Sequence, residues 1–178
     1  MYHNVLHFWF KEIKPSKWWL KNKDFDKLIK KKFKQLYESA IKCELYNWRN
    51  FSKGRLAEII ILDQFSRNMF RDTPKAFESD SQALCLAQQA ISLNIDKELN
   101  VYERLFLYMP FMHSESLTIQ ELSIKYFETL GLRNNLDYAK KHYKVIKRFN
   151  RFPHRNKILK RESSVEEINF LKLPGSRF

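Results

Sequence analysis

Apolar residues recur every three or four positions along most of this chain, the spacing that places them on one face of an α-helix. The clearest run extends from Asp24 to Ile41 and puts Phe25, Ile29 and Phe33 on one stripe. No segment alternates convincingly between apolar and polar residues as a half-buried strand would. The pattern therefore predicts an all-α protein.

Further helices follow from the same spacing and from residues that favour helix ends. We expect them over residues 52–70, 80–91, 100–112, 116–130, 136–149 and 164–171. Ser52, Asp80 and Asn100 are the expected N-caps of the first three, and Pro110 is expected to kink or end the third. Gly131 is the expected left-handed C-cap of the fourth.

Helices of this length joined by short connections predict antiparallel pairs, in a bundle or short solenoid of about seven helices. Ser163 and Ser164 are each followed three residues later by a glutamate, so overlapping capping boxes mark the start of the last helix. Residues 1–23 form an aromatic segment that we expect to pack on the domain as a lid. Residues 150–161 form an Arg- and His-rich loop, and residues 1–178 are expected to be a single domain.

Composition agrees with a helical, cytoplasmic protein. The chain is 44% hydrophobic, enough for a core, and its three glycines and five prolines are too few for a fold built from many hairpins. Cys43 and Cys85 are isolated on apolar stripes, so we expect both to be buried in a protein from a reducing compartment. No segment reaches the roughly 18 apolar residues that span a bilayer, and no membrane contact is expected.

The net charge of +13 is concentrated in two parts of the chain. Residues 1–53 carry 13 basic and 5 acidic side chains, mostly lysine among the basic ones, and residues 133–161 carry 11 basic and 1 acidic. Lysine on the outer face of a helix commonly serves solvation, and this chain's composition is typical of an AT-rich genome. The alternative is a surface that faces nucleic acid or a membrane.

Residues 148–161 have the composition of an anion site, because arginines and a histidine surround Pro153. The guanidinium fork of arginine matches the oxygens of carboxylates and phosphates. A proline at this place interrupts the preceding helix and makes backbone donors available. The segment indicates a binding site without naming its ligand.

A second polar constellation lies at the end of the predicted helix 52–70. Asp63, Arg67 and Arg71 are spaced by four, as are Gln64 and Asn68, so the five can face one cavity. The alternative is an ordinary surface ladder of Asp and Arg pairs, which contributes little stability. The absence of lysine from this stretch of a lysine-rich chain favours a site.

Histidines and a carboxylate follow in the second half of the chain. His113, Glu115, His142 and His154 could converge on a metal, but their spacing matches no metal signature, so no metal is expected. The same residues could perform acid-base chemistry, with a histidine that titrates near neutrality beside Glu115 or Asp63. No nucleotide- or flavin-binding motif is present, and no cofactor is expected.

Long ordered motifs across nearly the whole chain resemble the bacterial domain-of-unknown-function family 924. They are Val5-Leu6-His7-Phe8-Trp9-Phe10, Trp18, Asp24-Phe25-Asp26, Gly54-Arg55-Leu56-Ala57, Leu62-Asp63-Gln64-Phe65-Ser66-Arg67-Asn68, Leu107-Tyr108-Met109-Pro110, His113-Ser114-Glu115, His142 and Arg151-Phe152-Pro153-His154-Arg155-Asn156. The resemblance implies an all-helical fold similar to tetratricopeptide repeats and supports these site residues without supplying a reaction. The family pattern commonly has glycine where this chain has Asn150 and Lys160.

These observations combine into a helical protein with one pocket for a small anionic ligand that carries phosphate or carboxylate. The residues expected to line it are Asp63, Gln64, Arg67, Asn68, Arg71, His113, Glu115, His142, Arg151, His154, Arg155, Asn156 and Arg161. If the protein is an enzyme, His142 or His154 transfers the proton, and Glu115 or Asp63 orients it.

Three alternatives stay open at the level of sequence. The basic face from Arg133 to Arg161, with Tyr138, Tyr143, Phe149 and Phe152 for stacking, could bind RNA. The likeness to tetratricopeptide repeats could mean a protein-interaction scaffold, which is an argument from fold alone. The arginines could also be a structural network that ties the last helices to helix 52–70. The sequence does not indicate an oligomeric state.

Overall fold

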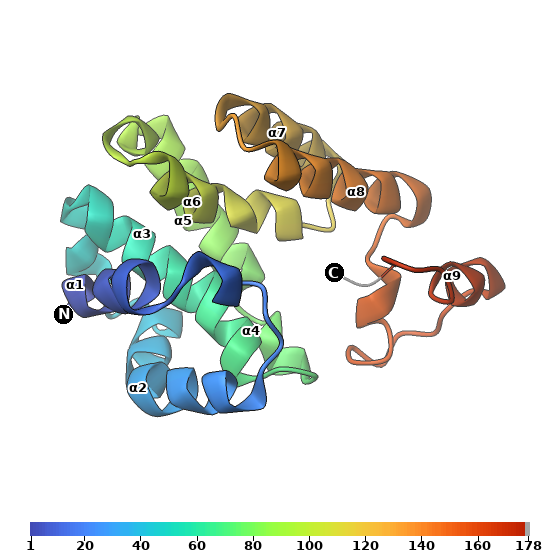
Figure 1. Ribbon diagram of the computed structural model, residues 1–178, viewed down its shortest axis with the longest axis horizontal. Helices are drawn as coiled ribbons and strands as arrows, with labels where there is room; N and C mark the ends of the chain where they lie inside the picture. The colour runs from blue at the N-terminus through green and yellow to red at the C-terminus, as the bar shows by residue number, and fades with distance from the viewer. Residues whose placement is uncertain (177–178) are drawn as a thin grey trace. The chain divides into compact units, whose positions relative to one another are not determined.

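The computed structural model describes residues 1–176, which are predominantly helical and include no β-strand (Figure 1). The all-α prediction is confirmed. Residue contacts divide the chain into a first unit, Met1–Arg71 with Lys75–Pro110, and a second unit, Asp72–Pro74 with the chain from Phe111 onward. The single domain expected from sequence stays a prediction, as does the likeness to tetratricopeptide repeats.

Most of the first unit is built from α-helices linked by short 3-10 and π-helical turns. Its α-helices are α1 (Tyr2–His7), α2 (Lys23–Ile41), α3 (Ser52–Ile60), α4 (Ser66–Met69), α5 (Asp80–Ser92) and α6 (Val101–His113), which continues into the second unit. The π-helical turns are Phe8–Glu12 and Ile61–Phe65, and the 3-10 turns are Pro15–Lys17, Tyr46–Asn50, Ile95–Glu98 and Pro74–Ala76, whose first residue belongs to the second unit. The expected helix 52–70 is therefore one continuous helical path with a π turn at its centre.

The aromatic N-terminal segment is part of the core of the first unit. Phe8 and Trp9 are at most 1% exposed, and Phe65 packs edge-on against both rings. The indole N–H of Trp18 donates to the main-chain oxygen of Trp9 at 3.0 Å, which closes the loop around Pro15. Phe8 and Trp9 thus belong to the interior, and a lid role for the segment stays a prediction.

Helix α2 shows how the apolar stripe determines packing. Ile29, Phe33 and Tyr37 are buried at helical spacing, and Phe33 contacts Phe65 with a ring-centre distance of 4.7 Å. The side chain of Asn22 caps the helix by accepting from the backbone of residues 24 and 25. The opposite face carries the lysines and is exposed.

The second unit contains α7 (Leu117–Thr129), α8 (Arg133–Phe149), the 3-10 turn Pro153–Arg155 and α9 (Val165–Phe170). Helices α7 and α8 lie side by side in Figure 1, joined by a tight turn in which Gly131 has φ of +69° as expected. Val145, Ile146 and Phe152 form the core and are covered by Leu117, Phe149 and Phe170. The predicted capping box of the last helix is present, between Ser164 and Glu167.

Two residues of the second unit hold the backbone conformation that favours glycine. Asn150, the C-cap of α8, has φ of +55°, and Lys160 has the same value. These are the two positions at which the resembled family commonly has glycine. The left-handed backbone explains that preference, because glycine adopts it without steric cost.

Several predicted helix ends differ from the structure. Asn100 caps α6 as expected, but Pro110 lies inside α6, which continues to His113. Asp80 does not cap α5, since its carboxylate pairs with Arg67. Ser52 does not cap α3 either, because its hydroxyl donates to Glu98.

The cysteine prediction was wrong. Cys43 and Cys85 are both free thiols with exposed side chains. Cys43 follows the C-terminal end of α2 with φ of +60°, and Gln82 donates to its sulfur at 3.3 Å. The helical stripe that seemed to bury Cys43 had already ended at Ile41.

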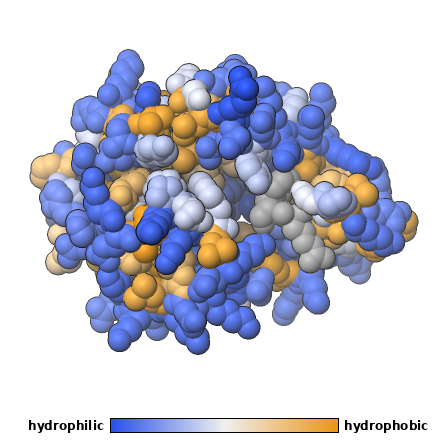
Figure 2. Space-filling view, viewed as in Figure 1, coloured by the Kyte–Doolittle hydropathy of each residue, from blue (hydrophilic) through white to orange (hydrophobic). Residues whose placement is uncertain are grey.

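Hydrophilic residues cover most of the face seen in Figure 2, with hydrophobic patches between them. Among residues 1–176, none of the helices combines the length and apolar character that crossing a bilayer requires.

Candidate functional site

The predicted site residues fall into two groups, one in each unit. Asp63, Gln64, Arg67, Asn68 and Arg71 lie in the first unit, whereas His113, Glu115, His142, Arg151, His154, Arg155, Asn156 and Arg161 lie in the second. That all thirteen line one pocket stays a prediction.

In the first unit, Arg67 lies between two carboxylates. Its Nη1 is 3.3 Å from Oδ1 of Asp63 and 2.9 Å from Oδ1 of Asp80, and it also donates to the main-chain oxygen of Asp63. Gln64 donates to the other oxygen of Asp63. Asp63 is fully buried and sits in the π turn, where the widened helix changes the direction of its side chains. These contacts form a largely buried network rather than the surface ladder that was the alternative.

Asn68 and Arg71 reach back to helix α2 and its Asp26. Arg71 Nε and Nη2 donate to the two carboxylate oxygens of Asp26 at 2.6 and 2.8 Å, and Asn68 Nδ2 donates to Oδ1 at 2.8 Å. The Asp63 and Arg67 pair follows the expected spacing of four. Asp26 was missed as a partner, although it stands in the quoted Asp24-Phe25-Asp26 motif.

In the second unit, the ring of Phe152 is surrounded by cationic and titratable groups. The imidazole of His142 is 5.4 Å from its centre, that of His154 is 5.6 Å away, and the guanidinium of Arg155 lies over the ring at 4.6 Å. His113 is 6.5 Å from His142, and its main-chain oxygen accepts from Arg155 Nη2 at 3.0 Å. We call these four side chains, with Phe152, the imidazole cluster.

His142 is the buried imidazole of the imidazole cluster, at 6% exposure, and Arg155 and Phe152 are buried as well. Its Nδ1 is 2.8 Å from the main-chain oxygen of Tyr138, which can only accept, so Nδ1 carries the proton and Nε2 is the acceptor. Burial and nearby positive charge together lower the pKa of His142 to about 3, although the hydrogen bond to Tyr138 raises it. His142 is therefore neutral at physiological pH, and the expected histidine titrating near neutrality is not this one. His113 and His154 are half-buried.

The carboxylate of Glu115 holds an arginine and a backbone amide in place rather than a histidine. Arg161 donates to its two oxygens at 2.7 and 3.0 Å, and the backbone N–H of Phe152 donates at 2.8 Å. Burial opposes ionisation of Glu115, but these hydrogen bonds outweigh it and lower the pKa of the carboxyl. The expectation that Glu115 orients a histidine is not supported by its contacts.

Arg151 and Asn156 also hold the loop in place. Arg151 donates to both oxygens of Glu167 at 2.6 and 2.7 Å, which lowers the pKa of Glu167 to about 2. Asn156 donates to Ser163 and accepts from Arg161 Nε, both at 3.0 Å. Of the predicted anion-binding arginines in this loop, Arg151 and Arg161 therefore hold carboxylates of the protein itself.

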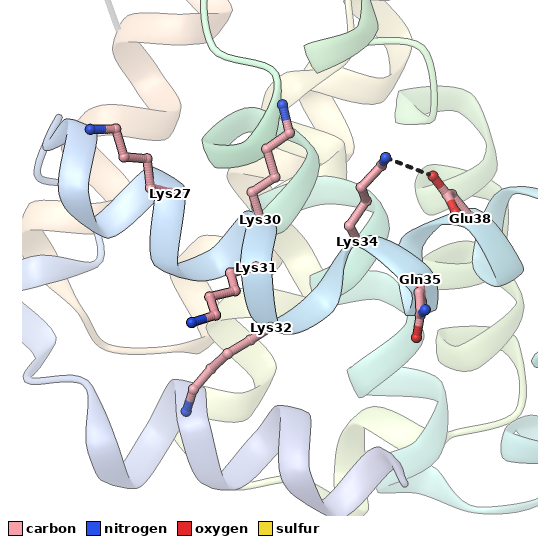
Figure 3. A pocket seen from close by; sticks show the side chains of 7 residues that line it. All are labelled: Lys27, Lys30, Lys31, Lys32, Lys34, Gln35 and Glu38. Atoms are coloured by element: carbon pink, nitrogen blue, oxygen red, sulfur yellow. Dashed lines mark ion pairs between the residues drawn. The ribbon is translucent and has the colours of Figure 1, made fainter.

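No three His, Cys, Asp or Glu side chains within residues 1–176 converge as a metal site requires. A hollow of about 670 Å³ lies on the outer face of α2, lined by Lys27, Lys30, Lys31, Lys32, Lys34, Gln35 and Glu38 (Figure 3). The ammonium groups point in different directions, and Lys34 pairs with Glu38 at 3.5 Å. The hollow lacks the convergent donors of an anion site.

Comparison with known proteins places this chain among relatives of unknown function. A solved structure of a protein of unknown function from Agrobacterium tumefaciens matches with a TM-score of 0.92 and 34% identity over 96% of each chain. No curated protein matches. The family model described as "Bacterial protein of unknown function (DUF924)" matches residues 5–175. The chain therefore belongs to the DUF924 family.

Proposed function

We propose that the protein binds a small anion, carrying a phosphate or carboxylate group, at the imidazole cluster of the second unit. The observation that supports this is the arrangement around Phe152. The side chains of His142, His154 and Arg155 lie 4.6 to 5.6 Å from its ring centre, and the ring of His113 lies 6.5 Å from that of His142. Imidazole N–H groups and guanidinium forks are the donors that recognise oxyanions.

The charge at the imidazole cluster comes from its own side chains, because the neighbouring ion pairs carry no net charge. Arg161 with Glu115 and Arg151 with Glu167 are each neutral as pairs. Arg155 cannot lose its charge, and His113 and His154 can each gain one, whereas burial keeps His142 neutral. An anion placed beside them is attracted by Arg155 and strengthens this attraction by favouring protonation of the histidines. The half-buried His113 and His154 give the ligand its access.

Catalysis, if the protein is an enzyme, falls to His154 rather than His142. A general acid or base works best when its pKa lies near the operating pH, and burial holds that of His142 near 3. His142 serves instead as a neutral hydrogen-bond acceptor through Nε2. Asp63 and Glu115, the other predicted catalytic residues, engage Arg67 and Arg161.

A thermal-shift screen tests this function directly. Wild-type protein, Arg155→Lys and Arg148→Lys are compared with inorganic phosphate, phosphorylated metabolites and dicarboxylates. Both substitutions keep the charge and remove the guanidinium fork, but Arg148 lies on the exposed surface and pairs with Glu166.

We expect an anion at 100 times its dissociation constant to add about 2.7 kcal/mol of stability to wild type and Arg148→Lys. Arg155→Lys should lose most of this effect while its circular dichroism stays unchanged. Equal stabilisation of all three proteins, or of none, contradicts the proposal.

A further inference from the structure

The outer face of α8 carries a line of basic side chains that the proposed anion site does not use. They are Lys140 and Lys141, then Lys144, then Lys147 and Arg148. Each group lies three or four residues after the one before, and all five side chains are exposed. We call this the basic face of α8. At a rise of about 1.5 Å per residue, each turn of four adds a positive charge about 6 Å further along the helix.

The four lysines on the basic face of α8 differ from the lysines of α2 in their ion pairs. Among the ion pairs of residues 1–176, none includes any of the four lysines on α8, and Arg148 pairs with the exposed Glu166. On α2, Lys27, Lys32 and Lys34 each pair with an acidic side chain. A face that served solvation alone would gain from acidic neighbours.

Two tyrosines lie among these lysines. Tyr138 is 52% exposed, and the ammonium of Lys141 lies 4.9 Å from its ring centre. The ammonium of Lys147 lies 5.7 Å from the ring of Tyr143. An aromatic face beside a line of cations is the combination that binds single strands, because bases stack on the ring while phosphates meet the lysines.

The same helix is poorly suited to lying on a membrane. Its apolar residues, including Ala139, Val145 and Ile146, are buried in the second unit. Tyr138 is the exposed large hydrophobic residue on this helix. An interfacial helix needs an apolar face to insert among the lipid chains. The charge on α8 therefore favours nucleic acid over a lipid surface.

We propose that the basic face of α8, with Tyr138, binds single-stranded RNA. RNA rather than DNA is the expected occupant because proteins reach unstacked bases mainly in single-stranded RNA regions, whereas duplex DNA keeps its bases stacked. The contact is made by phosphates and stacking, so it has little sequence preference and a strong dependence on salt.

The test is fluorescence anisotropy with labelled oligouridylate at two salt concentrations, roughly 50 and 200 mM. The first variant carries Lys140→Gln, Lys141→Gln, Lys144→Gln and Lys147→Gln. The matched control carries Lys27→Gln, Lys30→Gln, Lys31→Gln and Lys34→Gln on α2, which removes the same charge from exposed positions. Thermal melting checks that each variant is folded.

We expect the α8 variant to bind the RNA at least about tenfold more weakly than wild type. The slope of log K against log salt should become shallower by about 3, since each of the four lost phosphate contacts contributes about 0.7. Tyr138→Ala should lose roughly tenfold and keep the slope. The α2 control and Arg155→Lys should bind as wild type does, so this proposal can fail independently of the small-anion site.

Three results overturn the proposal. Equal weakening of the α2 control means that net charge alone attracts the RNA. If wild type does not bind oligouridylate at the lower salt concentration, the basic face of α8 is not an RNA site. Binding to phosphatidylglycerol vesicles, with no binding to oligouridylate, makes an anionic lipid the occupant.

Discussion

Arg161 donates to both carboxylate oxygens of Glu115 through its two terminal nitrogens, at 2.7 and 3.0 Å. This ion pair connects the loop after α8 to the segment just before α7, 46 residues earlier in the chain. The same carboxylate accepts the backbone N–H of Phe152, the residue at the centre of the imidazole cluster. This one carboxylate therefore fixes the position of the ring around which His142, His154 and Arg155 gather.

Glu115→Gln should cost about 2 to 4 kcal/mol of unfolding free energy, because the substitution removes the charge that neutralises a partly buried guanidinium. The side chains of Arg161 and Glu115 are 25% and 26% exposed. Glu166→Gln breaks the more exposed pair with Arg148 and should cost no more than about 0.5 kcal/mol. Urea unfolding of both variants measures the two losses of unfolding free energy. Equal losses would contradict this account of the loop.

Lys160→Gly should stabilise the protein by up to about 1 kcal/mol. The left-handed backbone at Lys160 strains a side chain with a Cβ, and glycine removes the strain at some entropic cost in the unfolded chain. Lys157→Gly has only the entropic cost and should destabilise by about 0.5 to 1 kcal/mol. Chemical denaturation compares the two, and a loss of stability in Lys160→Gly contradicts the prediction.

Gly54→Ala should destabilise the first unit by about 3 kcal/mol or more. A Cβ at this position would overlap the main-chain carbonyl of Trp48, which has no rotamer by which to move away. At Gly131 an added Cβ would meet nothing within 4 Å, and only the backbone strain of φ +69° remains. Gly131→Ala should therefore lower the free energy of unfolding by about 1 kcal/mol. Thermal melting ranks the two, and a reversed order would show that helix α3 can shift away from Trp48.

Acid should destabilise the protein through His142. Its pKa is about 3 when folded and near 6.5 when unfolded, so the unfolded chain takes up the proton first. The stability contribution is complete above pH 6.5 and is lost progressively as pH falls toward 3. His142→Asn keeps a donor for the Tyr138 carbonyl and cannot titrate.

The measurement is the unfolding free energy of wild type and His142→Asn from about pH 7 to pH 5. Wild type should lose more stability than the variant over this range, since Glu167, whose pKa is about 2, begins to contribute only below its unfolded value near 4.5. Parallel profiles would mean that His142 has the same pKa in the folded and the unfolded protein.

The helices were predictable because their apolar stripes are long, as on α2, and because local signals such as Asn100 and the Ser164 capping box act within one turn. Errors arose where a tertiary partner outcompeted the local signal. The carboxylate of Asp80 pairs with Arg67 instead of capping its own helix. Such a partner lies 13 residues away and leaves no local mark in the sequence.

The sequence indicated which residues belong to the candidate site, but not the role of each of them. Sequence identified Arg151, Arg155 and Arg161 alike, yet only the fold brings Glu167 to Arg151 and Glu115 to Arg161. The burial that neutralises His142 likewise depends on packing around Phe152. Charge pattern alone could not separate structural arginines from the one in the imidazole cluster.

The most direct test of the proposed anion site is an NMR titration of the five histidines with inorganic phosphate, because His3 and His7 are exposed and lie outside the cluster. We predict that phosphate shifts the ring resonances of His113, His142 and His154 and raises the pKa of at least one of them, while His3 and His7 stay unchanged. Arg155→Lys should abolish these shifts. If all five histidines respond alike, or if the three cluster histidines do not respond, the cluster does not bind phosphate.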